Sequence, residues 1–135
     1  MKNAGLARDY LRRARIRLTA LDVLHEGESW ADVVRESQEI VELALKGLLR
    51  SVGIDPPRIH DVSPILLAER DRLPAPLRAE ADALADISRS LRRDRELAFY
   101  GAEDLTPSGF YSRADADAAR SGARRVVEAV HPHVA

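Results

Sequence analysis

Apolar residues recur at three- and four-residue steps along most of this chain, which is the spacing of the buried face of an α-helix. This spacing predicts two long helices in the first half, over residues 2–24 and 29–52. It also predicts a short helix over 63–73, a third long helix over 77–99 and a last one over 112–130. No segment alternates convincingly with a period of two, so we expect no sheet. The pattern therefore predicts an all-α fold, an up-down bundle of four long helices plus a short fifth.

The predicted helix ends carry recognisable start and stop signals. Ser29 with Asp32, and Ser112 with Asp115, have the spacing of pairs that cap a helix N-terminus. Gly53 favours an end to the second helix. Residues 101–111 lie between two predicted helices, and we expect them to form a loop. The tips of the chain are the segments that we expect to be disordered.

The composition is that of a single helical domain. The chain has 135 residues, of which 45% are hydrophobic and 32% charged, so we expect residues 1–135 to form one domain with its own core. No apolar run approaches the roughly 20 residues that a membrane helix needs. The sequence has no cysteine, which excludes disulfides and thiol chemistry. These features predict a cytoplasmic protein that does not associate with a membrane.

Charge is distributed unevenly, although the net charge is only −1. Residues 1–20, which form most of the first predicted helix, are basic and hold a single acid, Asp9, among Lys2, Arg8, Arg12, Arg13, Arg15 and Arg17. The second is acidic, with Glu28, Asp32, Glu36, Glu39 and Glu42. We interpret these as solvated faces that pair between neighbouring helices, as most charge runs do. The alternative is that the basic helix forms a groove that binds phosphate groups.

An arginine falls on the predicted inner face of the third long helix. Arg95 continues, at helical spacing, a face that consists of Leu77, Ala81, Leu84, Ser88 and Leu91. A guanidinium keeps its charge at neutral pH, and burial costs it several kcal/mol of hydration. It therefore needs an acceptor such as a carboxylate, a phosphate or a group of a dimer partner. This requirement makes the end of the helix a candidate functional site.

The same segment carries a family resemblance. Arg95, four further residues and Tyr100 stand at the end of a long helix, in the position of an Arg-x4-6-His motif. The run 37–49 in the second helix, the pair His60-Asp61 before the third and Tyr111 before the last complete the pattern. This order of features resembles the HEPN domains, small helical proteins of prokaryotes that are often encoded beside minimal nucleotidyltransferases.

The resemblance implies both an assembly and an activity. HEPN proteins of this kind are homodimers in which two copies of the motif face one cleft, and the cleft binds RNA or a nucleotide. The implied partner is a minimal nucleotidyltransferase, in a toxin-antitoxin-like system. Carried over by position, Arg95 stabilises charge on the phosphate and Tyr100 takes the catalytic position, while Arg92 and Arg93 contribute RNA or nucleotide binding. The implied activity is that of a metal-independent endoribonuclease, and no cofactor is implied.

Tyr100 departs from the family motif, which has histidine there. Only about one phenol in a thousand is ionised at pH 7, which weakens Tyr100 as a base by about 4 kcal/mol relative to a group that titrates near neutrality. The motif is thus a degenerate one, Arg-x4-Tyr, and any RNase activity is expected to be weak. Tyr100 also fits an aromatic plug that packs beside Phe99. The alternative function is a non-catalytic helical dimerisation and interaction module in which Arg95 and Tyr100 are structural.

Two further sets of polar residues have structural and functional interpretations. Gln38 and Glu42 are one helical turn apart and are natural acceptors for Arg95, or they form a polar network that holds the second and fourth helices in register. His60 with Asp61 resembles a base with its orienting carboxylate, although such a pair before a helix is more often a cap.

The remaining histidines give weaker signals. His131 and His133 flank a proline at the end of the chain and lack a third metal ligand, so we interpret them as part of a disordered tail.

Overall fold

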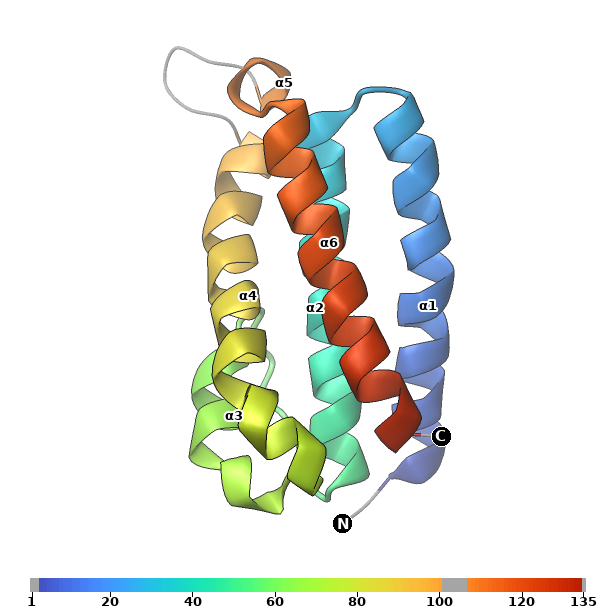
Figure 1. Ribbon diagram of the computed structural model, residues 1–135, viewed down its shortest axis with the longest axis vertical. Helices are drawn as coiled ribbons and strands as arrows, with labels where there is room; N and C mark the ends of the chain where they lie inside the picture. Colours follow the sequence, from blue (N-terminus) through green and yellow to red (C-terminus); the bar gives the residue numbers. More distant parts are fainter. Residues whose placement is uncertain (1–2, 101–106, 135) are drawn as a thin grey trace.

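The computed structural model describes the backbone of residues 3–100 and 107–134 and the side chains of residues 3–92 and 109–134. The four long helices are α1 (Ala4–Glu26), α2 (Trp30–Ser51), α4 (Ala75–Tyr100) and α6 (Arg113–Val130). They run alternately up and down, so that both ends of the chain lie at the same end of the bundle (Figure 1). No strand occurs within the described backbone. The predicted all-α bundle is therefore confirmed.

The short elements differ from the prediction in two places. The predicted helix over 63–73 is divided into α3 (Ser63–Ala68) and a 3-10 turn, η1 (Arg70–Arg72). Part of the predicted loop 101–111 forms a one-turn helix, α5 (Pro107–Phe110), while residues 101–106 lie outside the described residues. Tyr111 follows α5 and is buried, so its side chain packs in the core.

The end of the chain is ordered, contrary to the expectation of a disordered tail. Residues His131–His133 form a second 3-10 turn, η2, directly after α6. The next residue, Val134, is buried in the core. Burial of this side chain fixes the turn against the bundle, which the sequence pattern did not show because a single valine has no periodicity.

Helix α2 is the centre of the bundle, because it contacts α1, α4 and α6. Residues on most of its circumference are therefore buried, and Ile40 and Leu49 have no exposed surface. The core around α2 includes Leu21, Leu45, Leu48, Leu66, Leu77 and Leu84. Because α2 is surrounded, its polar side chains must find partners within the bundle or at the gaps between helices.

One of the two predicted caps is confirmed and the other is wrong. Ser112 and Asp115 form a capping box, in which each side chain accepts the backbone N–H of the other residue. Ser29 precedes α2, but its hydroxyl donates to the Asp32 carboxylate at 2.5 Å and caps no backbone N–H. Gly53 follows α2 with φ 86°, a left-handed conformation that glycine adopts without strain.

Candidate functional site

The end of α4 is the position of the predicted catalytic motif. The predicted inner face is confirmed as far as the side chains are described, since Leu77, Ala81, Leu84, Ser88 and Leu91 are all buried. Arg95 is the next residue at this spacing, and α4 continues as a helix to Tyr100. The side chains of Arg93, Arg95 and Tyr100 lie outside the described residues. Arg92 is half-buried.

Two turns before Arg95, a carboxylate joins α4 to the start of α3. Oδ1 of Asp61 accepts the hydroxyl of Ser88 at 2.8 Å and the backbone N–H of Ser63 at 2.9 Å. Asp61 thus serves the first residue of α3, as a cap would, and at the same time fixes α4 beside it. His60 faces a different partner, Glu42 of α2. The structure therefore does not bring His60 and Asp61 together as a base and its orienting carboxylate.

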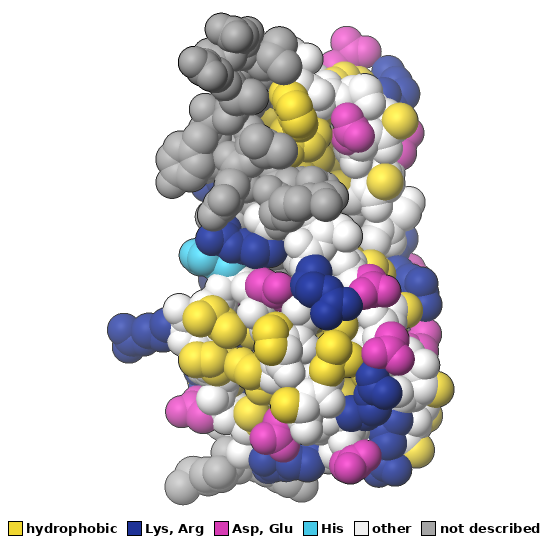
Figure 2. All heavy atoms as spheres, turned by 90° about the vertical axis from the view of Figure 1, so that its left-hand side faces the viewer, with side chains coloured by type: hydrophobic (Ala, Val, Ile, Leu, Met, Phe, Trp, Pro, Cys, Tyr) yellow, Lys and Arg dark blue, Asp and Glu magenta, His cyan; other side chains and the backbone are white. Residues whose placement is uncertain are grey.

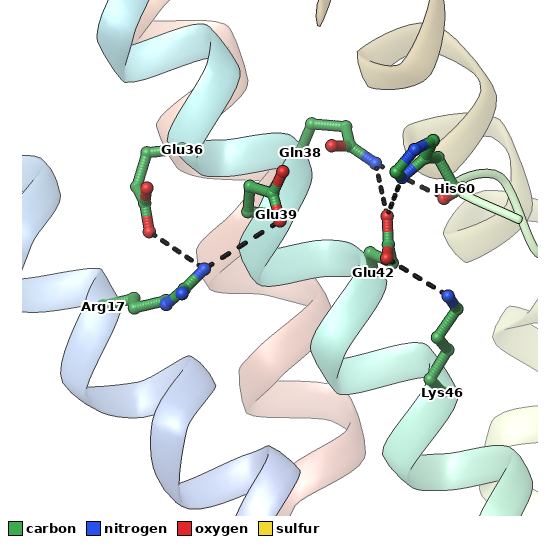
Figure 3. A network of polar contacts seen from close by, with 7 residues as sticks. All are labelled: Arg17, Glu36, Gln38, Glu39, Glu42, Lys46 and His60. Atoms are coloured by element: carbon green, nitrogen blue, oxygen red, sulfur yellow. Dashed lines mark hydrogen bonds and ion pairs between the residues drawn. The ribbon is translucent and has the colours of Figure 1, made fainter. Parts of the chain in front are cut away.

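Glu42 is the centre of a polar network on α2, drawn in Figure 3. Its Oε1 accepts Gln38 Nε2 at 3.2 Å and lies 2.8 Å from Nδ1 of His60, while its Oε2 accepts Lys46 Nζ at 3.1 Å. Gln38 Nε2 also donates to the backbone carbonyl of His60 at 3.3 Å. These contacts connect α2 to the segment before α3. Gln38 and Glu42 thus belong to a polar network whose other donors are His60 and Lys46, and among the described residues it joins α2 to this segment and not to α4.

The network controls the ionisation of Glu42. The side chains of Glu42 and Lys46 are each only 15% exposed. Burial raises the pKa of Glu42, but the hydrogen bonds from His60, Gln38 and Lys46 together outweigh burial, so the net pKa lies below its ordinary value. Glu42 is consequently a stable anion at neutral pH, suited to binding donors and unsuited to accepting a proton.

A second group of charges joins α1 to α2, on the side of α2 opposite Glu42 and His60 (Figure 3). Arg17 Nη1 lies 3.6 Å from Glu36 and 4.0 Å from Glu39. Burial raises the pKa of Glu36, and the nearby Arg17 offsets this only in part. The predicted pairing between the basic and acidic helices is therefore confirmed for Arg17. It is not general, because Arg8, Arg12, Arg13 and Arg15 have no carboxylate within 4.0 Å among the described residues.

The sequence contained a signal for one of the two missed contacts. Lys46 follows Glu42 by four residues, which is the spacing of an ion pair on one helix face. His60 is separated from Glu42 by 18 residues, and only the path of the loop after α2 brings the two side chains together. Its exposed ring, 47% accessible, makes it the part of the network that a ligand can reach most easily.

Comparison with known proteins identifies the family. The family model described as "HEPN domain" matches residues 7–133, nearly the whole chain. The chain therefore belongs to the HEPN domain family, whose all-α fold agrees with the observed bundle. No curated protein and no solved structure gives a significant match. No described helix combines the length and the apolar character that crossing a bilayer requires.

Proposed function

We propose that this protein is a dimeric HEPN protein that pairs with a minimal nucleotidyltransferase in a toxin-antitoxin-like system. In this proposal two copies of the Arg95 to Tyr100 segment face one cleft, which binds RNA or a nucleotide and cleaves RNA weakly without a metal. The observation that carries the proposal is the family match over 7–133 together with the buried face of α4, which leads through Leu91 to Arg95. Arg92 and Arg93 add positive charge beside that position.

The proposed chemistry assigns different tasks to the two motif residues. Cleavage requires a group that takes the proton of a ribose 2′-hydroxyl and a cation that stabilises charge on the phosphoryl oxygens. Arg95 supplies the permanent positive charge and a fork of donors that matches a phosphate. Tyr100 supplies a phenol, which donates a hydrogen bond or a proton well and accepts a proton poorly at pH 7. The proposed activity is therefore weaker than that of an Arg-x4-6-His site.

Cleavage of RNA in excess chelator tests the catalytic part. We expect the purified protein to cut RNA slowly, Arg95→Ala to abolish cutting, and Tyr100→His to increase it by restoring a group that titrates near neutrality. Arg89→Ala is the matched control, because Arg89 is an exposed arginine of α4 that pairs with Asp86. If neither Arg95→Ala nor Tyr100→His changes the rate of cleavage, the catalytic proposal is wrong.

A shallow groove beside the motif supports the dimer. It has a volume of about 280 Å³ and lies between α4 and α6, bordered by Ile87, Leu91, Ala118, Ala119 and Gly122. Leu91 is one helical turn before Arg95, so a second copy in this groove would bring two motifs close together. Figure 2 shows the side of the bundle formed by α3 and α4, where basic side chains border the region drawn in grey.

The mass of the protein in solution tests this arrangement. We expect light scattering to give the mass of a dimer, and Ala118→Arg to shift it to that of a monomer, because an exposed small residue in the groove is replaced by a bulky charge. Ser121→Arg, at an exposed position outside this groove, is the control and leaves the dimer intact. A monomeric parent protein, or a dimer that tolerates Ala118→Arg, contradicts the proposed interface.

The second candidate function is a non-catalytic dimerisation and interaction module for the nucleotidyltransferase. It is favoured by the network at Glu42, in which Gln38, Lys46 and His60 surround the carboxylate and join α2 to the segment before α3, as a structural network does. In this case Arg95→Ala lowers the free energy of unfolding by several kcal/mol and changes no turnover. Thermal unfolding measured on the same variants separates the two functions.

A further inference from the structure

A groove between α1 and η2 contains basic side chains that neither the family motif nor the core explains. It has a volume of about 480 Å³, and its lining includes Arg8, Arg12, Arg15, Ile16, His131 and Val134. This volume is within the range of small-ligand sites. The groove lies at the end of the bundle where the chain begins and ends, opposite the end of α4 that carries the Arg95 to Tyr100 segment (Figure 1).

The charges along the contact between α1 and α6 are balanced at one end only. Near the end of α1, Asp22 pairs with Arg120, and His25 lies 2.6 Å from Asp117. In the groove, by contrast, Arg8, Arg12 and Arg15 have no carboxylate within 4.0 Å among the described residues. One carboxylate, Glu128, borders an adjoining hollow that Arg15 and His131 also line. The groove therefore carries an excess of positive charge.

The side chain of Arg15 contacts a histidine of η2 and, among the described residues, no carboxylate. Arg15 Nη1 lies 3.1 Å from His131 Nε2. A guanidinium only donates, so Arg15 can use an imidazole nitrogen only as an acceptor. Because its contact is an imidazole and not a carboxylate, Arg15 keeps donors that can bind an anion.

The form of the groove favours phosphate groups of a nucleotide chain. Arg8, Arg12 and Arg15 follow one another at four- and three-residue steps, which places neighbouring Cβ atoms about 5–6 Å apart on one face of α1. A guanidinium group presents paired donors that match the oxygens of a phosphate. Ile16, which is 55% exposed, offers an apolar surface beside these arginines on which a base or ribose can rest.

We propose that this α1–η2 groove binds the phosphates of RNA or of a free nucleotide, at a site separate from the cleft of the family motif. The proposal extends the proposed function in its ligand but does not depend on Arg95 or Tyr100. Its arginines hold the phosphate backbone, and Ile16 contacts a base. For an RNA-cleaving protein, such a site would increase the affinity for the substrate without taking part in the chemistry.

Fluorescence anisotropy with a labelled single-stranded oligoribonucleotide tests the groove. We expect the triple variant Arg8→Ala/Arg12→Ala/Arg15→Ala to weaken binding at least about tenfold at low salt and to reduce the salt slope by about 2, since three phosphate contacts are lost. The control is Arg70→Ala/Arg72→Ala/Arg89→Ala, which removes the same charge from arginines that pair with Asp82, Glu69 and Asp86. Equal weakening by both triple variants would mean that net charge alone governs binding, and would overturn the proposal.

Two further measurements identify the ligand and separate this site from the motif. If ATP competes with the labelled RNA for the parent protein but not for the groove variant, the ligand is a free nucleotide. If RNA binds and ATP does not compete, the ligand is the nucleic acid. Equal competition by polyglutamate overturns the preference for phosphate. RNA binding through the groove persists in Arg95→Ala, so failure of the cleavage experiment leaves this prediction standing. Loss of all RNA binding in Arg95→Ala contradicts a separate site.

Discussion

Replacing Glu42 with alanine is expected to lower the free energy of unfolding by about 3 kcal/mol, in the range for a broken buried ion pair. The reason is that Lys46, whose side chain is only 15% exposed, loses the carboxylate that neutralises it. Gln38, which is 2% exposed, loses one of the acceptors of its amide. Chemical denaturation measures the change directly. Glu69→Ala is the control, because the exposed pair of Glu69 with Arg72 contributes at most about 1 kcal/mol.

The same network predicts a dependence on pH. The pKa of Glu42 is lowered in the folded protein from an ordinary value of 4.5, so the folded state favours its ionised form. This contribution to stability is complete above the unfolded value and is lost as the pH falls through the lower folded value. Comparison with Glu42→Gln isolates it, since the difference between parent and variant should shrink below about pH 4.5. A constant difference, or a loss for Glu42→Ala no larger than for Glu69→Ala, contradicts this role.

Gly47→Ala is expected to destabilise the fold by about 1–3 kcal/mol, although alanine favours a helix. Gly47 lies where α2 packs closely on α1, and a Cβ there would be 2.5 Å from Leu11 Cδ2, 3.2 Å from Tyr10 Cβ and 3.3 Å from the backbone oxygen of Ala7. Leu11 is buried and has little room to move, while the other two contacts can be relieved only by shifting α1.

Gly5→Ala provides the matched comparison within the neighbouring helix. No atom outside the local backbone lies within 4 Å of a Cβ at Gly5, so the substitution restricts only the unfolded chain. It should therefore stabilise the protein by about 0.4–1 kcal/mol. Opposite signs for the two glycines, measured by chemical denaturation, would show that close helix packing explains Gly47. A neutral or stabilising Gly47→Ala would show that α1 yields easily.

The family motif itself was found from the sequence, whereas the site around it was found only in part. Helical spacing predicted the buried face from Leu77 to Leu91, because a repeat of 3.6 residues is a local property of the chain. It also placed Gln38 and Glu42 on one helix face, since residues four apart are neighbours there. The histidine that completes their network comes from a loop whose course no local pattern defines.

The sequence by itself determined the four long helices, the capping box at Ser112 and the family, because helix propensity, apolar spacing and capping act between residues close along the chain. Only the tertiary structure decided which helix is surrounded and which charges remain unpaired. It joined His60 to Glu42 and His131 to Arg15, across 18 and 116 positions. Such contacts depend on how whole helices pack against one another, and packing is governed by the volume and shape of many side chains together.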